Sequence, residues 1–426
     1  MPRARFQSAR DCHPPRPCRR RAVRAVLGSL TCSVCLGTAA LAQTSESSRA
    51  AQIEALRRAK AEAIAEAPKP GRIEAAINYV EQSRIFPRIF NPPRGWFAQI
   101  GGVSEGNGFT MGGGYRQPTE AGVITARAVG SLRQSYLGSV ELRRAILPRE
   151  TGFIAATITR RHEAAQRFYG LGPDSSDGNT SFGLSATAVE VTAGVKVTSW
   201  LTGTAAVGYL NPDVTESSET QRIPDTRLGF VDRDAPGLDI QPTFVTSQVA
   251  AIVDTRDTLN PRRGGYYQAS LRRYADRDGG QYSFSGVRVD LQQFIPFWNE
   301  SRVLALRVLA DHTDGIGQGQ VPFYLMPTLG GARLLRGYDR QRYRDRSLLL
   351  VSAEYRYEIN PFLMAALFYD AGQVAPDWSD FRVRDLRDAY GIGFRFGYSN
   401  AVALRSDIVF GGEDPVRLIL GFTTSF

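Results

Sequence analysis

The feature of this sequence that most constrains its fold is an alternation of apolar and polar residues from residue 95 to the C-terminus. In residues 347–358, for example, mostly aliphatic and aromatic residues at odd positions alternate with Ser352, Glu354 and Arg356 at even positions. A period of two is that of a β-strand, whose side chains point alternately to opposite faces. After residue 42 no window holds 18 consecutive apolar residues, which excludes an α-helical membrane protein. The pattern predicts an all-β fold, a transmembrane antiparallel β-barrel whose strands face lumen and lipid in turn.

The number of alternating runs predicts about sixteen strands. The runs lie between residues 95 and 426, and the total is sixteen if residues 179–198 form one long strand. An even number is what single-chain bacterial barrels have. Connections such as Asn299-Glu300-Ser301 and Asn360-Pro361 look tight, whereas 212–240 and 312–345 are long and polar. This asymmetry is typical of short periplasmic turns and long extracellular loops.

The N-terminal residues 1–42 have the three regions of a secretory signal peptide. Arginines at 19–24 precede an apolar run to about Leu36, and Ala40-Leu41-Ala42 forms a small-residue cleavage site. We therefore expect export and removal of this segment, with the mature chain in the bacterial outer membrane. Removal takes all four cysteines, so no thiol remains for disulfides, catalysis or metal binding. It also takes eight arginines and one aspartate, which lowers the formal charge from +10 to +3 and weakens any case for nucleic-acid binding.

Residues 43–95 predict a short helical periplasmic leader before a barrel domain at 96–426. Helix-forming residues run from Ser45 to about Ala67, and Pro68-Lys69-Pro70-Gly71 stops them. The segment is too short for a substantial domain with its own core. Two readings stay open: it docks to a partner or plugs the lumen, or it is solvated and partly disordered.

The C-terminus resembles the signal by which outer-membrane barrels are recognised for assembly. The chain ends on Phe426, and Phe422 shares its parity with the apolar residues of the last predicted strand, next to Gly421. Thr424 departs from the pattern, since an apolar residue is usual there.

Two motifs in the last third of the chain carry a family resemblance. The first is Leu335-Arg336-Gly337-Tyr338, inside the long loop, and the second is Phe368-Tyr369-Asp370-Ala371-Gly372, about thirty residues later. Glu354-Tyr355-Arg356 lies between them, and Phe168-Tyr169-Gly170-Leu171-Gly172 adds a weaker match. Over roughly residues 95–426 the chain resembles the BamA/TamA superfamily of outer-membrane assembly and translocation barrels (the bacterial surface antigen barrel domain), in a form without periplasmic polypeptide-binding repeats. The resemblance implies that the Arg336 motif belongs to the sixth extracellular loop.

Side-chain parity supports the same grouping on physical grounds. Glu354 and Asp370 fall on the lumen parity of their strands, and charges inside a barrel need partners. A glycine-rich loop can fold into the lumen, where Arg336 can offer a planar fork of donors to both carboxylates. We therefore expect loop 312–345 to be an in-folded lid held at Glu354, Phe368, Asp370 and Gly372. The alternative is that Arg336 is one of many arginines in a solvated extracellular loop.

Glycines near both ends of the barrel suggest a weak seam. The first predicted hairpin contains seven glycines between Gly101 and Gly114, and the last strand contains Gly421. Glycine in a strand loses side-chain packing, so pairing of the first and last strands should be weak and open to strand addition. The glycines could equally serve only to fit a bulky lid.

The sequence predicts no enzyme, no metal site and no cofactor. After signal removal only His162 and His312 remain, both expected at strand ends or in loops, without metal-ligand spacing or a Ser/His/acid set. Two functions stay open: insertion or translocation of polypeptide at the outer membrane, or a passive channel or structural surface protein with a retained lid. The partners expected are outer-membrane lipids including lipopolysaccharide, with unfolded polypeptide clients and a separate periplasmic partner as candidates.

Overall fold

The computed structural model describes residues 54, 89–101, 103, 109–175, 179–219, 222–258, 260–360, 362–398 and 401–421, with the backbone alone at 299, 300, 398 and 401–403. The chain divides into two units, Met1–Ser83 and Arg84–Phe426. In the first unit the structure describes Glu54, which is helical. The expected signal peptide at 1–42 and most of the expected leader therefore lie outside the described residues and stay predictions.

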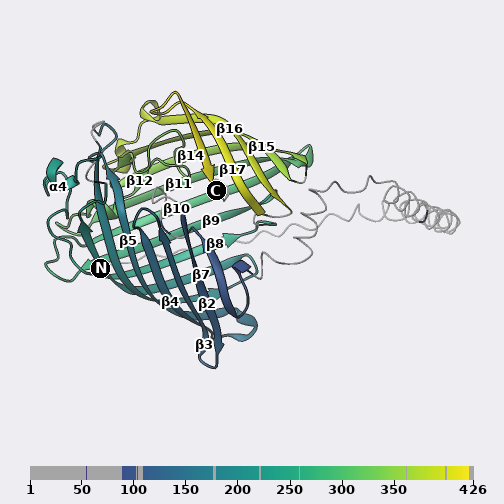
Figure 1. The fold of residues 1–426 in the computed structure, drawn as a ribbon, viewed down its shortest axis with the longest axis horizontal. Coiled ribbons are helices and arrows are strands. Elements are labelled where there is room, and N and C mark those ends of the chain that lie inside the picture. Colours follow the sequence, from purple (N-terminus) through teal and green to yellow (C-terminus); the bar gives the residue numbers. More distant parts are fainter. Residues whose placement is uncertain are drawn as a thin grey trace, which may run out of the picture. The chain divides into compact units, whose positions relative to one another are not determined.

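The second unit contains one sheet of sixteen strands in sequence order, with every neighbouring pair antiparallel (Figure 1). The strands are β1 (Gly95–Ile100), β2 (Thr110–Thr119), β3 (Gly122–Ser131), β4 (Tyr136–Ala145), β5 (Gly152–Phe168), β6 (Thr180–Lys196), β7 (Leu201–Thr215), β8 (Phe244–Asp254), β9 (Gly264–Asp276), β10 (Phe284–Phe297), β11 (Asn299–Gly315), β14 (Ser347–Asn360), β15 (Leu363–Ala375), β16 (Arg387–Tyr398), β17 (Ala401–Phe410) and β18 (Val416–Gly421). This arrangement confirms the all-β antiparallel barrel and the count of sixteen, since the run expected at 179–198 contains one strand, β6.

Short elements occupy the connections. They are η1 (Pro148–Glu150), α4 (Thr226–Gly229), η2 (Phe323–Leu325), the paired strands β12 (Thr328–Leu329) and β13 (Tyr343–Arg344), η3 (Trp378–Asp380) and η4 (Val383–Asp385). Among the described residues, no helix is long and apolar enough to cross a membrane.

Three local expectations were wrong. The turn after β10 is at Trp298, because Asn299 already pairs with Phe297 and the positive φ of 65° falls on Trp298. The long loops expected at 212–240 and 312–345 are instead 216–243 and 316–346, because β7 continues to Thr215 and β11 continues to Gly315. Near the end of β7, Val214 is buried in a cluster with aromatic side chains. These two loops define what we call the long-loop end of the barrel.

The two histidines were also misplaced, since both lie within strands. His162 is in β5 and His312 in β11, with their side chains on the outward parity. Each ring is accommodated by a hydrogen bond between Nδ1 and a serine hydroxyl on the next strand, Ser185 at 2.9 Å and Ser347 at 2.8 Å.

The core of the unit lies inside the barrel. On β14 the lumen-facing Leu350 and Glu354 are fully buried, whereas the outward Val351 is 44% exposed. At the long-loop end, loops 216–243 and 316–346 add apolar residues to this interior, and Phe323 packs against Phe168 and Phe182. Alternation thus separates a filled lumen from an apolar outer surface.

The strand order begins with β1 and ends with β18, and within the described residues no pairing joins these two strands. Gly114 of β2 leaves room for the ring of Phe97, since a Cβ there would lie 2.3 Å from that ring. At least one glycine of the first hairpin therefore serves packing within the wall, and the weak seam stays a prediction.

Candidate functional site

Loop 316–346 forms a small hairpin whose tip contacts the barrel wall. Strand β12 pairs with β13, and the chain between them turns sharply at glycines with positive φ. At Gly330, with φ +116°, a Cβ would lie 2.1 Å from the carbonyl oxygen of Asp339, so only glycine fits this close backbone approach. The tight tip presents Arg336 to the wall.

The Arg336 guanidinium is held by two carboxylates of the wall. Its Nε and Nη2 donate to Asp370 on β15 at 2.6 and 2.8 Å, and its Nη1 donates to Glu354 on β14 at 3.1 Å. The guanidinium also stacks on the Phe368 ring, with its central carbon 3.5 Å from the ring centroid. The structure thus brings together Arg336, Glu354, Phe368 and Asp370, four of the residues that the sequence singled out.

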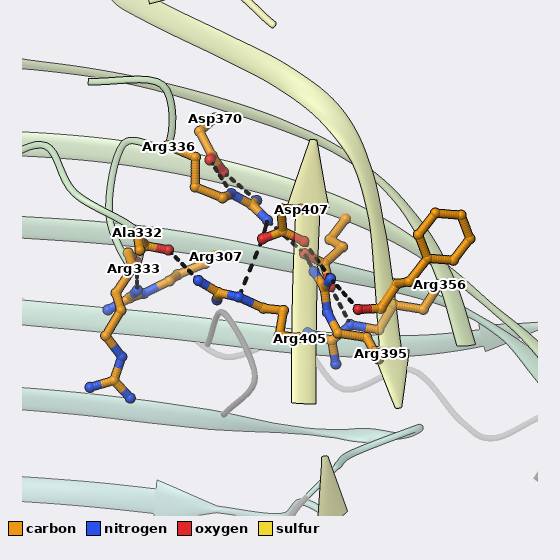
Figure 2. A network of polar contacts seen from close by, with 11 residues as sticks. Arg307, Ala332, Arg333, Arg336, Arg356, Asp370, Arg395, Arg405 and Asp407 are labelled. Atoms are coloured by element: carbon orange, nitrogen blue, oxygen red, sulfur yellow. Dashed lines mark hydrogen bonds and ion pairs between the residues drawn. The ribbon is translucent and has the colours of Figure 1, made fainter. Parts of the chain in front are cut away.

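Three more arginines and one carboxylate complete the cluster, as Figure 2 shows. Arg356 donates to Glu354 at 2.9 Å, and Arg395 on β16 donates to Glu354 at 3.0 Å and to Asp407 on β17. Arg405 lies 3.2 Å from Asp407 and donates to the carbonyl oxygen of Ala332 in the loop at 2.7 Å. Sequence reasoning missed Arg395, Arg405 and Asp407 as site residues, although all three lie on the lumen parity of alternating runs.

The cluster is an unusual concentration of buried charge. Arg336, Arg356, Arg395 and Arg405 face Glu354, Asp370 and Asp407, and none of these seven side chains is more than 3% exposed. Such charges are tolerated only when they are paired and hydrogen-bonded. Burial alone would lower the pKa of Arg336, but Asp370, then Glu354 and Asp407, raise it above the ordinary value of an arginine. Arg336 therefore remains a cation.

Apolar contacts enclose the cluster on the loop side. Leu335 is fully buried among leucine, valine and aromatic side chains of the wall, and the Tyr338 hydroxyl donates to the carbonyl oxygen of Asp388 at 3.3 Å. Gly337 and Gly372 permit the approach: a Cβ on Gly337 would lie 2.9 Å from the Gly411 carbonyl oxygen, and one on Gly372 would lie 3.1 Å from Leu329.

The same loop is tied to the β17–β18 connection. The backbone amide of Glu413 donates to the Gly337 carbonyl at 3.1 Å, and the Glu413 carboxylate accepts from the backbone amide of Asp339 at 2.8 Å. Arg342 forms an ion pair with Glu413, and Arg417 lies 2.9 Å from the Asp339 carboxylate.

On its other side the loop reaches β5. Gln341 accepts from the backbone amide of Arg167 and donates to Gln166, both at 3.0 Å, and Arg340 donates to the Ala165 carbonyl at 2.7 Å. Tyr169, in the weakly matching Phe168–Gly172 motif, donates to Asp339 at 3.0 Å. One loop therefore joins β5 to β15–β18, which are far apart in the strand order.

A second buried arginine fixes the base of the hairpin. Arg344 on β13 is 2% exposed; it donates to the Phe323 carbonyl at 2.6 Å and lies within 6 Å of the rings of Phe168, Phe182 and Phe323. Burial and then the nearby Arg340 lower the pKa of Arg344. The sequence contained no motif that marked this contact.

The C-terminal residues expected to form the assembly signal are described in part. Gly421 ends β18, while Phe422 and Phe426 lie outside the described residues, so the C-terminal assembly signal stays a prediction. In the part of the chain that the structure describes, no group of three or more His, Cys, Asp or Glu side chains could hold a metal ion.

Comparison with known proteins decides the family. A model of the Omp85 superfamily domain matches residues 145–410, which span loop 316–346, Glu354 and Asp370. The chain belongs to the Omp85 superfamily. This assignment confirms the resemblance to BamA and TamA, and it makes the protein an integral outer-membrane β-barrel. Omp85 proteins are in general not enzymes.

One solved structure of low sequence identity agrees on the fold. BamA of Haemophilus ducreyi, crystallised without POTRA domains 1–3, is 14% identical over 76% of this chain and 68% of that chain, with a TM-score of 0.56. CdiB from Acinetobacter baumannii is 12% identical over 78% of this chain and 57% of that chain, with a TM-score of 0.43. No curated protein matches the sequence.

Proposed function

We propose that this Omp85 barrel inserts polypeptide into the outer membrane or translocates it across the membrane, with loop 316–346 as a lid inside the barrel. The observation that carries the proposal is the cluster in which Arg336 of the loop meets Asp370 and Glu354 of the wall. The cluster holds the loop against the lumen side of the wall, as a lid that is closed at rest requires, whereas a permanently open pore does not require such a contact.

The contacts of the loop support a closed resting state. The loop is held at β14 and β15 through Arg336, at the β17–β18 connection through Glu413, and at β5 through Gln341. Removing one partner of a buried ion pair costs about 3–5 kcal/mol, so spontaneous release should be rare. Client binding would have to offset that cost, and the clients we propose are unfolded polypeptides. Either residues 43–95 or a separate periplasmic protein would capture them.

The test uses the full chain in liposomes, with insertion of an unfolded outer-membrane barrel client and ion conductance as the two readouts. We compare the natural protein with Arg336→Ala and with the control Arg288→Ala. Arg288 also faces the lumen and pairs with a wall carboxylate, Asp311 at 2.9 Å, and its side chain is 40% exposed. We expect the natural protein to accelerate client insertion, Arg336→Ala to insert more slowly and conduct more, and Arg288→Ala to match the natural protein.

Two results would contradict the proposal separately. Steady conductance of the natural protein without any acceleration of the client would favour the passive channel and reject the polypeptide function. Equal insertion and equal conductance of the natural protein and Arg336→Ala would reject the lid.

A further inference from the structure

A groove of about 660 Å³ lies on the outer wall of the barrel, over β6 to β10. Most of its lining residues share the parity of Val249 and Leu271, which are 52% and 56% exposed. On β9, Arg272 lies between Leu271 and Arg273 and points to the opposite face, where it pairs with Asp311 inside the barrel. The groove therefore faces the lipid, and its volume lies within the roughly 300–1,000 Å³ of sites that bind small ligands.

Small side chains form the hollow. Ala193 on β6 and Ala205 on β7 are direct cross-strand neighbours, and Ala205 is opposite Val249 on β8. The same row continues through Leu271 and Val287 on β9 and β10. Two alanines beside branched aliphatic residues leave a depression with apolar walls.

A polar row borders this apolar row. Arg273 on β9 has Ser247 of β8 and Ser285 of β10 as its two cross-strand neighbours. Arg273 lies closer than Leu271 to Asp276, where β9 ends at the long-loop end. Over β8 to β10 the groove is thus polar toward the long-loop end and apolar toward the middle of the membrane, while over β7 and β6 the polar row continues with Val207 and Val191.

The Arg273 side chain is exposed on this surface, and within the described residues it forms no hydrogen bond or ion pair. Arg160 on β5 differs, since it also points outward but donates to the Thr187 hydroxyl at 2.7 Å. A lipid-facing arginine costs about 2–4 kcal/mol at the middle of a bilayer and about 0–1 kcal/mol near the interface. An anionic group of a lipid would offset that cost and accept two hydrogen bonds from the guanidinium fork.

We propose that this groove binds the phosphorylated, acylated headgroup region of an outer-leaflet lipid, the lipid A part of lipopolysaccharide. Its phosphate meets Arg273, Ser247 and Ser285, and one acyl chain lies over Ala193 and Ala205. The direction of the groove matches a lipid of the outer leaflet, whose headgroup is at the extracellular surface and whose chains point toward the bilayer centre. The inference rests on the outer-membrane location and is independent of the polypeptide function.

The experiment is native mass spectrometry of the full chain in detergent with added bisphosphorylated lipid A. The variants are Arg273→Ala, Arg273→Lys, Ala205→Trp to fill the hollow, and Arg160→Ala as the matched outward-facing control. We expect Arg273→Ala and Ala205→Trp to bind about five- to tenfold more weakly, Arg273→Lys to bind at an intermediate level, and Arg160→Ala to bind as the natural protein does. Lipid A without its phosphates should bind as weakly to the natural protein as bisphosphorylated lipid A binds to Arg273→Ala.

If the natural protein and Arg273→Ala bind bisphosphorylated lipid A equally well, the proposal is overturned. It is also overturned if the natural protein binds lipid A without phosphates as well as it binds bisphosphorylated lipid A. Phosphatidylglycerol that binds as well as lipid A would overturn the choice of occupant. Folding of each variant is checked by its heat-modified mobility on gels. If Arg273→Ala does not fold, Arg273→Lys and Ala205→Trp still decide, because unchanged binding by both would reject the site.

Discussion

Replacing Arg336 by alanine should destabilise the barrel by about 3–5 kcal/mol, because it leaves a carboxylate buried without its cation. Arg336 donates two hydrogen bonds to Asp370 and one to Glu354. Glu354 would keep Arg356 and Arg395 as partners. Among the described residues Asp370 has only Arg336 as an ion-pair partner, so the penalty falls on Asp370.

The magnitude follows from the contacts. A hydrogen bond to a charged group contributes roughly 1.5–3 kcal/mol, so the two bonds to Asp370 together contribute roughly 3–6 kcal/mol. Both side chains are at most 2% exposed, so water cannot replace the lost donor without a rearrangement. Replacing Asp370 as well removes the buried carboxylate that has lost its cation. The double variant Arg336→Ala/Asp370→Ala should therefore be about 1–3 kcal/mol more stable than the sum of the two single changes predicts.

The assay is urea unfolding of the full chain in detergent micelles, followed by fluorescence of its four tryptophans. The control Arg288→Ala should cost less than about 1 kcal/mol, because Arg288 is partly exposed and Asp311 keeps Arg272. A loss of under about 1 kcal/mol for Arg336→Ala, or strict additivity in the double variant, would refute the reasoning about Asp370.

Three further changes probe the surroundings of the cluster. Phe368→Ala should cost about 3–5 kcal/mol in the same urea assay, because it removes a buried ring and the surface on which Arg336 stacks; a cost below that of Arg288→Ala would contradict this. Gly337→Ala should cost about 1–3 kcal/mol, since φ is +95° and the new Cβ would clash with Gly411, whereas Gly203→Ala, with no atom within 4 Å, should be nearly neutral; equal effects would be the contrary result. Glu413→Ala should cost about 1–3 kcal/mol, because the buried Arg342 loses its ion pair with Glu413, and should speed tryptic cleavage within loop 316–346, as measured by peptide mass mapping; an unchanged cleavage rate would show that Glu413 does not hold the loop.

Much of the wall could be predicted because a period of two is a local property. Alternation placed Glu354 and Asp370 on the lumen face, and β14 and β15 place both side chains there. The prediction from local residue type was wrong at Asn299, which is typical of turns but pairs with Phe297 as the first residue of β11. Helical or extended preferences of single residues are weaker than the pairing of a whole strand.

The sequence by itself determined that this chain forms a barrel of alternating strands, which side chains face its interior, and that Arg336 lies in a loop able to bend inward. Only the tertiary structure decided which side chains contact one another inside the barrel. Arg395, Arg405 and Asp407 join Arg336, and Gln341 reaches β5, because strand register and the path of loop 316–346 bring them together. Parity assigns a side chain to a face of the sheet. It does not determine which strands face each other across the lumen, because that depends on how the whole sheet curls and how the loop between β11 and β14 folds back.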